Sequence, residues 1–284
     1  MSEAWIALVI GNTRLHWGLF YQEKLVGAWH TPHLTAKLAD PIKQSRFRAD
    51  AWQNLADIAS GYPYLPQQSI SLSDLWIASV VPSQTALWVE TPDQGRPEQA
   101  HIVLRSHIPL LGLYATLGID RAINLLGAGS TLGWPVLVID SGTALTFTAG
   151  TGNSQQPTVY GGAILPGVRL QRQSLAQQTA TLSGAAEAAS SLTGMSLPDR
   201  WAADTTGAIA SGLVYSLIAT ISDYLADWWQ RFPVGQAVIT GGDGPMLHAL
   251  LQQRTPEVAS RVRVDSYLMF SGMQVYRKAL MRES

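Results

Sequence analysis

The chain has 284 residues, of which 46% are hydrophobic and 14% are charged, and its formal net charge is -1. A charge so close to zero excludes a nucleic-acid-binding protein that relies on an overall basic field. The lack of cysteine excludes a disulfide scaffold, a cysteine nucleophile, a zinc–thiolate site and an iron–sulfur centre. The opening MSEAWIALVI has no signal-peptide features, so we expect a cytoplasmic protein that does not bind a membrane.

The N-terminal segment predicts a strand, a tight turn and a second strand, because the apolar run 5–10 meets Gly11-Asn12-Thr13. This pattern is typical of a β-hairpin or a meander. The other elements expected in this part are strands over 14–21 and 25–30, a helix within 35–60, a buried strand over 75–81 that Pro82 ends, a loop over 91–100 and a strand over 101–104.

The rest of the chain alternates apolar strands, glycine turns and helices. Its clearest helix is expected over 205–231, where apolar residues recur at helical spacing until Pro233 ends the pattern. The other expected elements are a helix over 118–129, strands over 135–139 and 144–149, a loop over 150–157, a structured glycine segment over 161–167, a helix over 168–180, a small and polar segment over 183–200, a strand over 237–240, a helix opened by Pro245, a strand over 261–265 and a helix over 267–281.

Two segments of the sequence repeat the same pattern of elements. Residues 7–13 and 136–144 each place an apolar strand before a glycine turn and a second strand. Aligning Gly11 with Gly142 sets Val9 opposite Asp140. Each copy also opens a half with a similar order of strands and helices, so we predict two related α/β halves that face a cleft.

Three glycine turns that follow apolar strands are candidate phosphate sites: GNT at 11–13, DSGT at 140–143 and TGGDG at 240–244. Glycine lets backbone N–H groups approach a phosphate closely, and a strand-to-helix turn presents the N–H groups of a helix N-terminus. Asp140 is a candidate ligand for a cation beside the phosphates, and Thr143 supplies a hydroxyl. Taken alone, DSGT and GNT are better explained as ordinary turns, and TGGDG is equally well explained as a tight strand–helix connection. Their occurrence together favours a nucleotide site.

Asp120 and Arg121, in the segment GIDR, stand at the expected start of a helix. An aspartate in this place most often caps the helix. The functional alternative is a base or orienting carboxylate beside an anion-binding arginine. Both interpretations remain open on these residues alone.

Taken together, these segments resemble the type III pantothenate kinases, a family in the superfamily of acetate and sugar kinases, actin and chaperone ATPases. The wording IGNTRLHWG is similar to that of the cyanobacterial branch. The matching segments follow the family's order and span most of the chain: LVIGNTRLHWG (8–18), SVVP (79–82), GIDRAINLLGA (118–128), VLVIDSGTALT (136–146), GGAILPG (161–167), TTGAIASG (205–212) and VITGGDG (238–244).

The resemblance implies that ATP phosphorylates pantothenate to 4′-phosphopantothenate, the first step of coenzyme A biosynthesis. It also implies an α/β fold of two similar actin-like ATPase (ribonuclease H-like) halves with an ATP cleft between them. We expect these halves at residues 1–115 and 116–284, the second containing the catalytic and dimerisation elements. Mg²⁺, a monovalent cation (K⁺ or NH₄⁺) and a homodimer are implied as well, with the apolar helix 205–231 as a candidate interface.

Individual roles follow from the positions that match the family's motifs. Asp120 corresponds to the catalytic aspartate, and Asp140 corresponds to the site of the monovalent cation. The substrate-binding residues implied in this way are Tyr114, Gly118, Ile119, Asp120, Arg121 and Thr205. The ATP-binding residues implied are Val9, Ile10, Gly11, Asn12, Thr13, Arg14, Leu15, His16 and Thr143.

One position departs from the family's pattern. The family usually has an aspartate where this chain has Val9, so a carboxylate that helps to place magnesium and the phosphates is missing. Two alternatives to a pantothenate kinase therefore stay open on the same fold. One is a catalytically weakened nucleotide-binding regulatory protein, and the other is a kinase of another small alcohol.

Overall fold

The computed structural model describes residues 4–45, 47, 72–89, 99–179, 181–189 and 196–283. Most of the predicted loop 91–100, and the end of the predicted helix within 35–60, lie outside these residues. The described chain forms two compact units. Unit 1 contains Met1–Gly127 together with Met269–Ser284, and unit 2 contains Ala128–Leu268.

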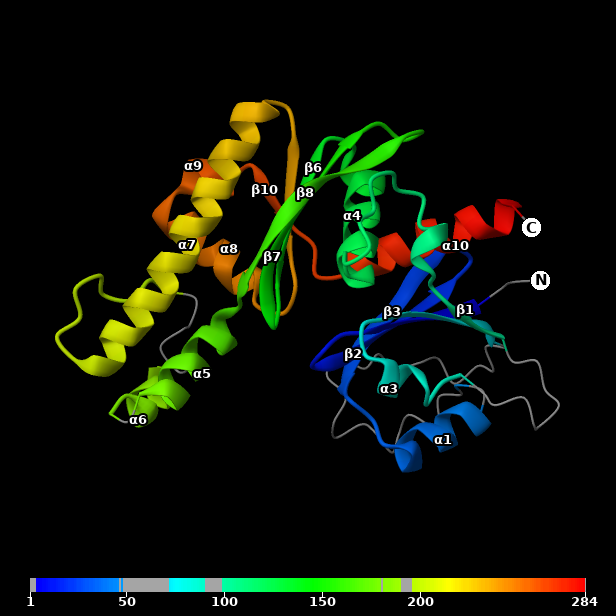
Figure 1. Ribbon diagram of the computed structural model, residues 1–284, viewed down its shortest axis with the longest axis horizontal. Helices are drawn as coiled ribbons and strands as arrows, with labels where there is room; N and C mark the ends of the chain where they lie inside the picture. The colour runs from blue at the N-terminus through cyan, green and yellow to red at the C-terminus, as the bar shows by residue number, and fades with distance from the viewer. Residues whose placement is uncertain are drawn as a thin grey trace. The chain divides into compact units, whose positions relative to one another are not determined.

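Unit 1 is built on a five-stranded sheet in the order β3-β2-β1-β4-β5 (Figure 1). The central strand β1 pairs antiparallel with β2 and parallel with β4, and its residues are buried throughout. A strand buried on both faces reads as a continuous apolar run, as AWIALVI does. The strands are β1 (Ala4–Ile10), β2 (Arg14–Tyr21), β3 (Lys24–Pro32), β4 (Leu72–Ser79) and β5 (Gln99–Ile102).

Unit 2 repeats this arrangement in the order β10-β9-β6-β7-β8. Its central strand β6 pairs antiparallel with β7 and parallel with β9, so the strand order and the directions match those of unit 1. The internal repeat and the α/β class with two similar halves are therefore confirmed. The strands are β6 (Val136–Ser141), β7 (Ala144–Gly152), β8 (Pro157–Pro166), β9 (Gln236–Thr240) and β10 (Val262–Val264).

The helices connect and cover these sheets. In chain order they are α1 (Ala36–Gln44), α3 (Pro82–Thr85), the 3₁₀ turn η3 (Arg105–His107), α4 (Ile119–Leu132), α5 (Val168–Gln178), α6 (Ser183–Ala188), α7 (Thr205–Arg231), α8 (Gly244–Arg254), α9 (Pro256–Ala259) and α10 (Leu268–Glu283). Two expectations change. β4 ends at Ser79 and Pro82 opens a short helix, and residues 161–166 of the glycine segment form the end of β8, where Gly161 and Gly162 pair in the ladder with β7.

The register supports the predicted alignment of Gly11 with Gly142. Val9 pairs with His16 on β2, and Asp140 pairs with Thr146 on β7. Both residues stand one position before the end of a central strand. Side chains alternate between the two faces of a strand. Residues next to Val9 and Asp140 belong to the main apolar cluster of their unit, so Val9 and Asp140 lie on the opposite face of the sheet.

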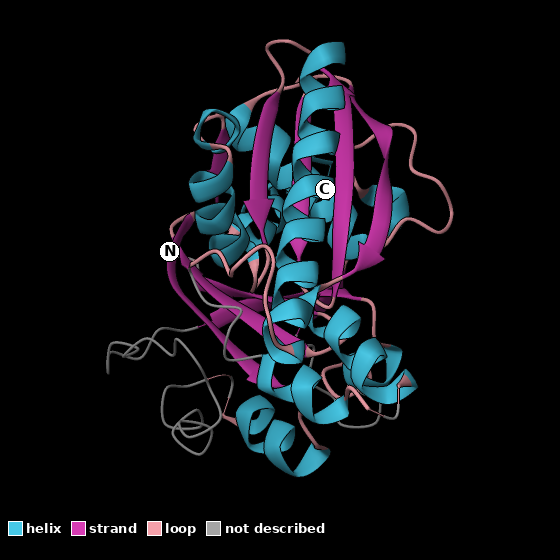
Figure 2. Ribbon diagram, turned by 90° about the vertical axis from the view of Figure 1, so that its left-hand side faces the viewer, coloured by secondary structure: helices cyan, strands magenta, loops and turns pink. Residues whose placement is uncertain are grey.

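Helix α7 lies across one face of the unit 2 sheet (Figure 2). Its apolar side packs into the same cluster as Leu137 and Ile139 of β6 and Leu250 of α8. The helix is long and apolar enough to cross a membrane, yet half of its 18-residue apolar stretch is buried inside the protein. We therefore describe α7 as a core helix of unit 2.

Helix α10 belongs to unit 1, although it ends the chain. Gly272 packs so closely that a Cβ atom there would lie 2.0 Å from the carbonyl oxygen of Ile123 on α4. Tyr276 is fully buried, and its hydroxyl oxygen accepts a hydrogen bond of 3.0 Å from the Leu104 N–H. The compact units consequently divide the chain inside α4, later than residue 115, and return the last helix to the first unit.

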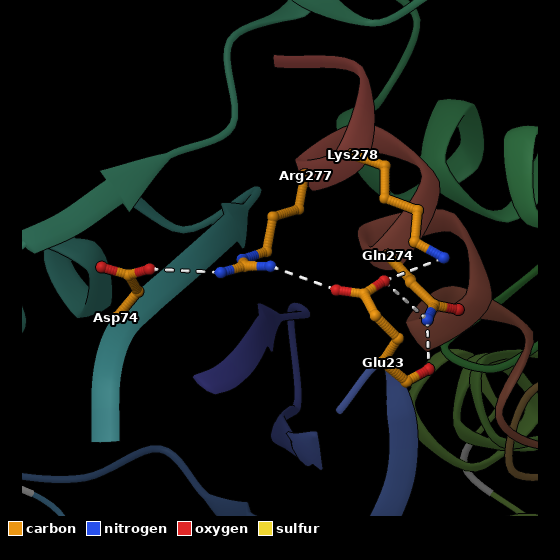
Figure 3. A network of polar contacts seen from close by, with 5 residues as sticks. All are labelled: Glu23, Asp74, Gln274, Arg277 and Lys278. Carbon is orange, nitrogen blue, oxygen red and sulfur yellow. Dashed lines mark hydrogen bonds and ion pairs between the residues drawn. The ribbon is translucent and has the colours of Figure 1, made fainter. Parts of the chain in front are cut away.

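A charged network holds α10 within unit 1 (Figure 3). Arg277, which is 2% exposed, places Nη2 3.4 Å from Asp74 Oδ2 and Nη1 3.4 Å from Glu23 Oε1. Lys278 Nζ pairs with the half-exposed Glu23 at 2.8 Å. His101 approaches the other oxygen of Asp74 at 3.5 Å. A buried guanidinium thus links β4, the β2–β3 turn and α10.

Replacing Arg277 by Met keeps most of the apolar stem and removes the charge. We expect the free energy of unfolding to fall by about 3 kcal/mol, because the buried Asp74 carboxylate loses its main cationic partner. Lys278→Met is the matched control and should cost less than about 1 kcal/mol, since exposed ion pairs contribute little. Urea unfolding followed by tryptophan fluorescence measures both. Equal losses in the two variants would contradict a structural role for the buried pair.

Candidate functional site

Three glycine turns of unit 2 meet at the carboxyl ends of β6 and β9. The Asp243 N–H donates a 3.0 Å hydrogen bond to the carbonyl oxygen of Ser141. The Gly167 N–H, just after β8, donates a 3.1 Å hydrogen bond to the carbonyl oxygen of Thr143. The turns DSGT, LPG and TGGDG, which lie far apart in the sequence, therefore form one cluster.

Two of the glycines in this cluster are required by the packing of the turns. A Cβ atom at Gly241 would lie 2.4 Å from the Ser141 carbonyl oxygen and 2.5 Å from Asp140 Oδ1, and its φ is +86°. A Cβ atom at Gly167 would lie 2.3 Å from the carbonyl oxygen of Gly142. Glycine at these two positions allows one turn to pack against another, which is a structural role.

Two further glycines, Gly142 and Gly242, have open space beside them. Among the described residues, a Cβ atom at Gly142 would make only an ordinary contact, and one at Gly242 would meet nothing within 4 Å. Neither position needs glycine for packing. An open backbone at the end of a central strand is what the close approach of a phosphate requires. Gly142 and Gly242 therefore fit the functional reading.

Asp140 faces this open region from the end of β6. It pairs with Thr240 of β9, so the carboxylate and the threonine side chain share one sheet face. Thr240 Oγ1 is buried and has no hydrogen-bond partner in the described part of the chain. Carboxylate and hydroxyl oxygens are ligands suited to a hard cation. Among the described residues no group of three or more His, Cys, Asp or Glu side chains forms a metal cage.

The corresponding turn of unit 1 follows β1. The Gly11 N–H donates to the Arg14 carbonyl oxygen at 3.0 Å, and Asn12 and Thr13 are exposed at its tip. Val9 is buried, with 3% of its surface exposed. Its side chain offers no oxygen to a metal, so the two turns differ in charge at this position.

His16 lies beside this turn as a neutral side chain. Burial, followed by the nearby His30 and Arg14, lowers the pKa of His16 from 6.5 to about 4. The two histidine rings are cross-strand neighbours with centroids 6.0 Å apart. Because the folded-state pKa lies below the unfolded value, the neutral ring contributes stability above pH 6.5 that is lost as the pH falls towards 4.

A second group of predicted residues meets at the start of α4 in unit 1. Asp120 lies in the first turn of α4, and its Oδ1 accepts a 2.8 Å hydrogen bond from the Arg121 N–H, so the side chain contributes a local contact at the helix start. Arg121 is 8% exposed, and its Nη1 donates to the Tyr114 hydroxyl at 3.3 Å. A Cβ atom at Gly118 would lie 2.4 Å from Asp120 Oδ1. Glycine before the helix therefore leaves space for the carboxylate.

The predicted residues thus fall into separate groups. Tyr114, Gly118, Ile119, Asp120 and Arg121 lie together in unit 1, and Asp140 and Thr143 lie together in unit 2. Thr205 is the exposed first residue of α7 in unit 2. Its helix is capped by Asp204, whose Oδ1 accepts from the Gly207 N–H at 2.8 Å.

Sequence reasoning missed two residues that the structure adds to these groups. Asp204 has a visible signal, an aspartate before a long helix. His33 lies outside every motif, yet its Nε2 is 2.8 Å from the carbonyl oxygen of Gly11. Only the pairing of β3 with β2 places His33 beside this turn.

The two adjacent glycines after β9 provide a test of the turn cluster. Gly241→Ala should destabilise the protein by about 1–3 kcal/mol, because the alanine must adopt a left-handed backbone and displace the Ser141 carbonyl. Gly242→Ala should change stability by less than about 0.5 kcal/mol, since open space surrounds that position. Thermal unfolding compares the pair. A more damaging change at Gly242 would contradict the packing described above.

Known proteins match this chain over nearly its whole length. The family model of the type III pantothenate kinases matches residues 5–227. A type III pantothenate kinase from Nostoc sp. is 43% identical over 274 residues, which is 96% of this chain and 94% of the relative. The enzyme of the same name from Synechocystis sp. is 38% identical and covers 96% and 90% of the two chains. That from Synechococcus elongatus is 37% identical and covers 98% of each.

One solved structure supports the fold independently. A Campylobacter jejuni protein assigned to the Baf family aligns with a TM-score of 0.56 at 18% identity, over 98% of this chain and 99% of that chain. The resemblance stated from the motifs is confirmed by the sequence relatives, which are mostly cyanobacterial. This chain belongs to the type III pantothenate kinase family.

Proposed function

We propose that this chain transfers the terminal phosphoryl group of ATP to pantothenate, which gives 4′-phosphopantothenate, the first step of coenzyme A biosynthesis. The relatives named type III pantothenate kinase support the reaction. The observation that carries it to this chain is the group at the start of α4. There a carboxylate, Asp120, adjoins a buried arginine that is hydrogen-bonded to Tyr114.

This group suits a substrate that bears both a hydroxyl and a carboxylate. Asp120 accepts the proton of the attacking hydroxyl, and Arg121 with Tyr114 binds the carboxylate of pantothenate. Consecutive helical residues do not face each other, so their charged ends are directed towards different parts of an extended molecule. A neutral sugar has no carboxylate for Arg121, so this group favours pantothenate over a neutral sugar. Gly118, Ile119 and Thr205 complete the proposed substrate contacts.

The glycine turns are the proposed nucleotide contacts. The segment from Val9 to His16 and the hydroxyl of Thr143 approach the phosphates of ATP, with the open backbone at Gly142 beside them. Phosphoryl transfer passes through a loose transition state, in which positioning and charge stabilisation supply most of the catalysis. Mg²⁺ characteristically binds through substrate phosphates and water, with only one or two protein carboxylates. The change to Val9 is compatible with that mode of binding.

Asp140 is the proposed ligand of a monovalent cation. The carboxylate shares its sheet face with the buried hydroxyl of Thr240, which has no hydrogen-bond partner among the described residues, so oxygen ligands of two strands lie on the same face. A cation in this place offsets negative charge near the phosphates. The donor set therefore fits K⁺ or NH₄⁺.

A homodimer in the cytoplasm completes the proposal. The apolar side of α7 is occupied by the core of its own unit, contrary to the simplest expectation for an interface helix. A dimer contact through α7 would use its exposed side, which presents small residues such as Gly212, Ser216 and Ala219. Sedimentation equilibrium tests the assembly.

A coupled assay of ADP release with and without pantothenate tests the reaction itself. Val9 motivated the alternative of a regulatory protein with weakened catalysis, and family membership favours the kinase. Release of ADP that depends on pantothenate supports the kinase. Tight ATP binding without turnover would support the regulator, and preferential turnover of another alcohol would support a different kinase.

We expect turnover to require a monovalent cation in addition to Mg²⁺. Replacing potassium by a bulky organic cation at constant ionic strength should lower the rate, because that ion cannot enter the space beside Asp140. Asp140→Asn should be slower in potassium and insensitive to the exchange. An unchanged wild-type rate after the exchange would remove the assignment of Asp140.

Asp120→Asn separates capping from catalysis. Asparagine keeps an oxygen for the Arg121 N–H, so thermal stability should barely change. It cannot take a proton, so turnover should fall by roughly 10²–10⁴-fold while ATP binding is retained. Asp120→Ala, run beside it, removes the hydrogen bond to the Arg121 N–H as well and should also lower the melting temperature. A near-native rate in Asp120→Asn would make capping the whole role of this residue.

A further inference from the structure

His33 makes a contact with the unit 1 turn that none of the sequence motifs anticipates. The residue lies directly after β3, and its Nε2 is 2.8 Å from the carbonyl oxygen of Gly11. A carbonyl oxygen can only accept a hydrogen bond, so this contact requires a proton on Nε2. The imidazole therefore acts as a donor to the backbone of the turn.

The segment that carries His33 is itself held from both sides. The Leu34 N–H donates to Gln84 Oε1 at 3.1 Å, and Gln84 Nε2 donates to the Leu34 carbonyl oxygen at 3.0 Å. Leu34 is buried in the apolar cluster of unit 1. Gln84 belongs to α3, which follows the parallel strand β4. The two hydrogen bonds with Gln84 and the burial of Leu34 therefore fix the backbone next to His33.

Gly11 is a position where such a restraint matters. Its φ is not in the left-handed region, and a Cβ atom there would make only an ordinary 3.5 Å contact with the Arg14 carbonyl oxygen. Packing therefore does not demand glycine, and the residue brings backbone freedom that something else must remove. The Arg14 carbonyl holds the Gly11 N–H at 3.0 Å, and His33 holds the Gly11 carbonyl.

The orientation of the Gly11 carbonyl group determines the direction of the next N–H group along the chain. In a trans peptide the C=O of one residue and the N–H of the next point to opposite sides of the chain. With the Gly11 oxygen turned towards His33, the Asn12 N–H points away from it, at a residue that is exposed. Backbone N–H groups in such a turn are the donors that bind phosphate.

We propose that His33 is a positioning residue for the nucleotide: its Nε2–H orients the Gly11–Asn12 peptide so that the Asn12 N–H is directed at a phosphate of ATP. This inference rests on the proposed function of the turn. In this proposal His33 acts through the backbone, by its contact with the Gly11 carbonyl oxygen.

Two substitutions separate the donor from the bulk of the side chain. His33→Gln places an amide N–H near the position of Nε2 and keeps a donor, whereas His33→Met has a similar length and no donor. His107→Gln, at an exposed histidine of the same unit, is the control. The readouts are the dissociation constant of a non-hydrolysable ATP analogue, KM for ATP, KM for pantothenate and the melting temperature.

His33→Met should weaken binding of the analogue and raise KM for ATP by roughly 3- to 10-fold, as expected for one lost hydrogen bond. KM for pantothenate should stay unchanged, and His33→Gln should restore most of the loss. His107→Gln should match the wild type. A general loss of stability would not raise KM for ATP while leaving KM for pantothenate unchanged. A selective rise in KM for ATP therefore identifies a positioning role.

Two results would overturn the inference: analogue binding by His33→Met equal to that of the wild type, or binding by His33→Gln as weak as that by His33→Met. The proposed function fails separately. If the wild type binds the analogue but does not phosphorylate pantothenate, the proposed reaction is refuted. The comparison of analogue binding between the variants then still tests the role of His33. A wild type that does not bind the analogue refutes both.

Discussion

Each unit depends on one central strand that is paired on both edges, antiparallel to a hairpin partner and parallel to a strand from much later in the unit. This pairing removes both edges of β1 and β6 from solvent and buries their side chains on both faces. The carboxyl end of the central strand then becomes the place where turns from several segments converge. In unit 2 the convergence is so close that Gly241 and Gly167 have no space for a side chain.

The convergence explains why acidic and hydroxyl groups tolerate a partly buried position at these strand ends. A strand end surrounded by turns has backbone N–H groups and carbonyl oxygens within reach, and these compensate charge that an apolar core would not. Asp140 takes this place in unit 2, and the equivalent position of unit 1 is occupied by the buried Val9. The two units therefore share their strand order and strand directions, and they differ in charge at this position.

The chain closes on itself through α10. A fully buried Arg277 among Glu23, Asp74 and an aromatic ring at 5.0 Å ties the last helix to strands formed by the first part of the chain. Such contacts between distant segments cost chain entropy to form, and a buried ion pair stabilises only when its geometry is well satisfied. The same helix packs on α4, which carries Asp120 in its first turn. Its docking therefore supports the candidate catalytic group.

The sequence by itself determined the family, the α/β class, the repeated strand–turn–strand unit and most element positions, including α7 from Thr205 to Arg231. These features are local, because apolar periodicity, glycine turns and motif order are properties of short segments. Only the tertiary structure decided that α10 joins the first unit, that Gly241 is packed while Gly242 is open, and that His33 holds Gly11. The reason is physical: strand pairing and side-chain packing bring together residues that are separated by 22 positions in the case of His33 and Gly11, and by 203 in the case of Asp74 and Arg277. No local pattern records which distant partner a strand or a helix will meet.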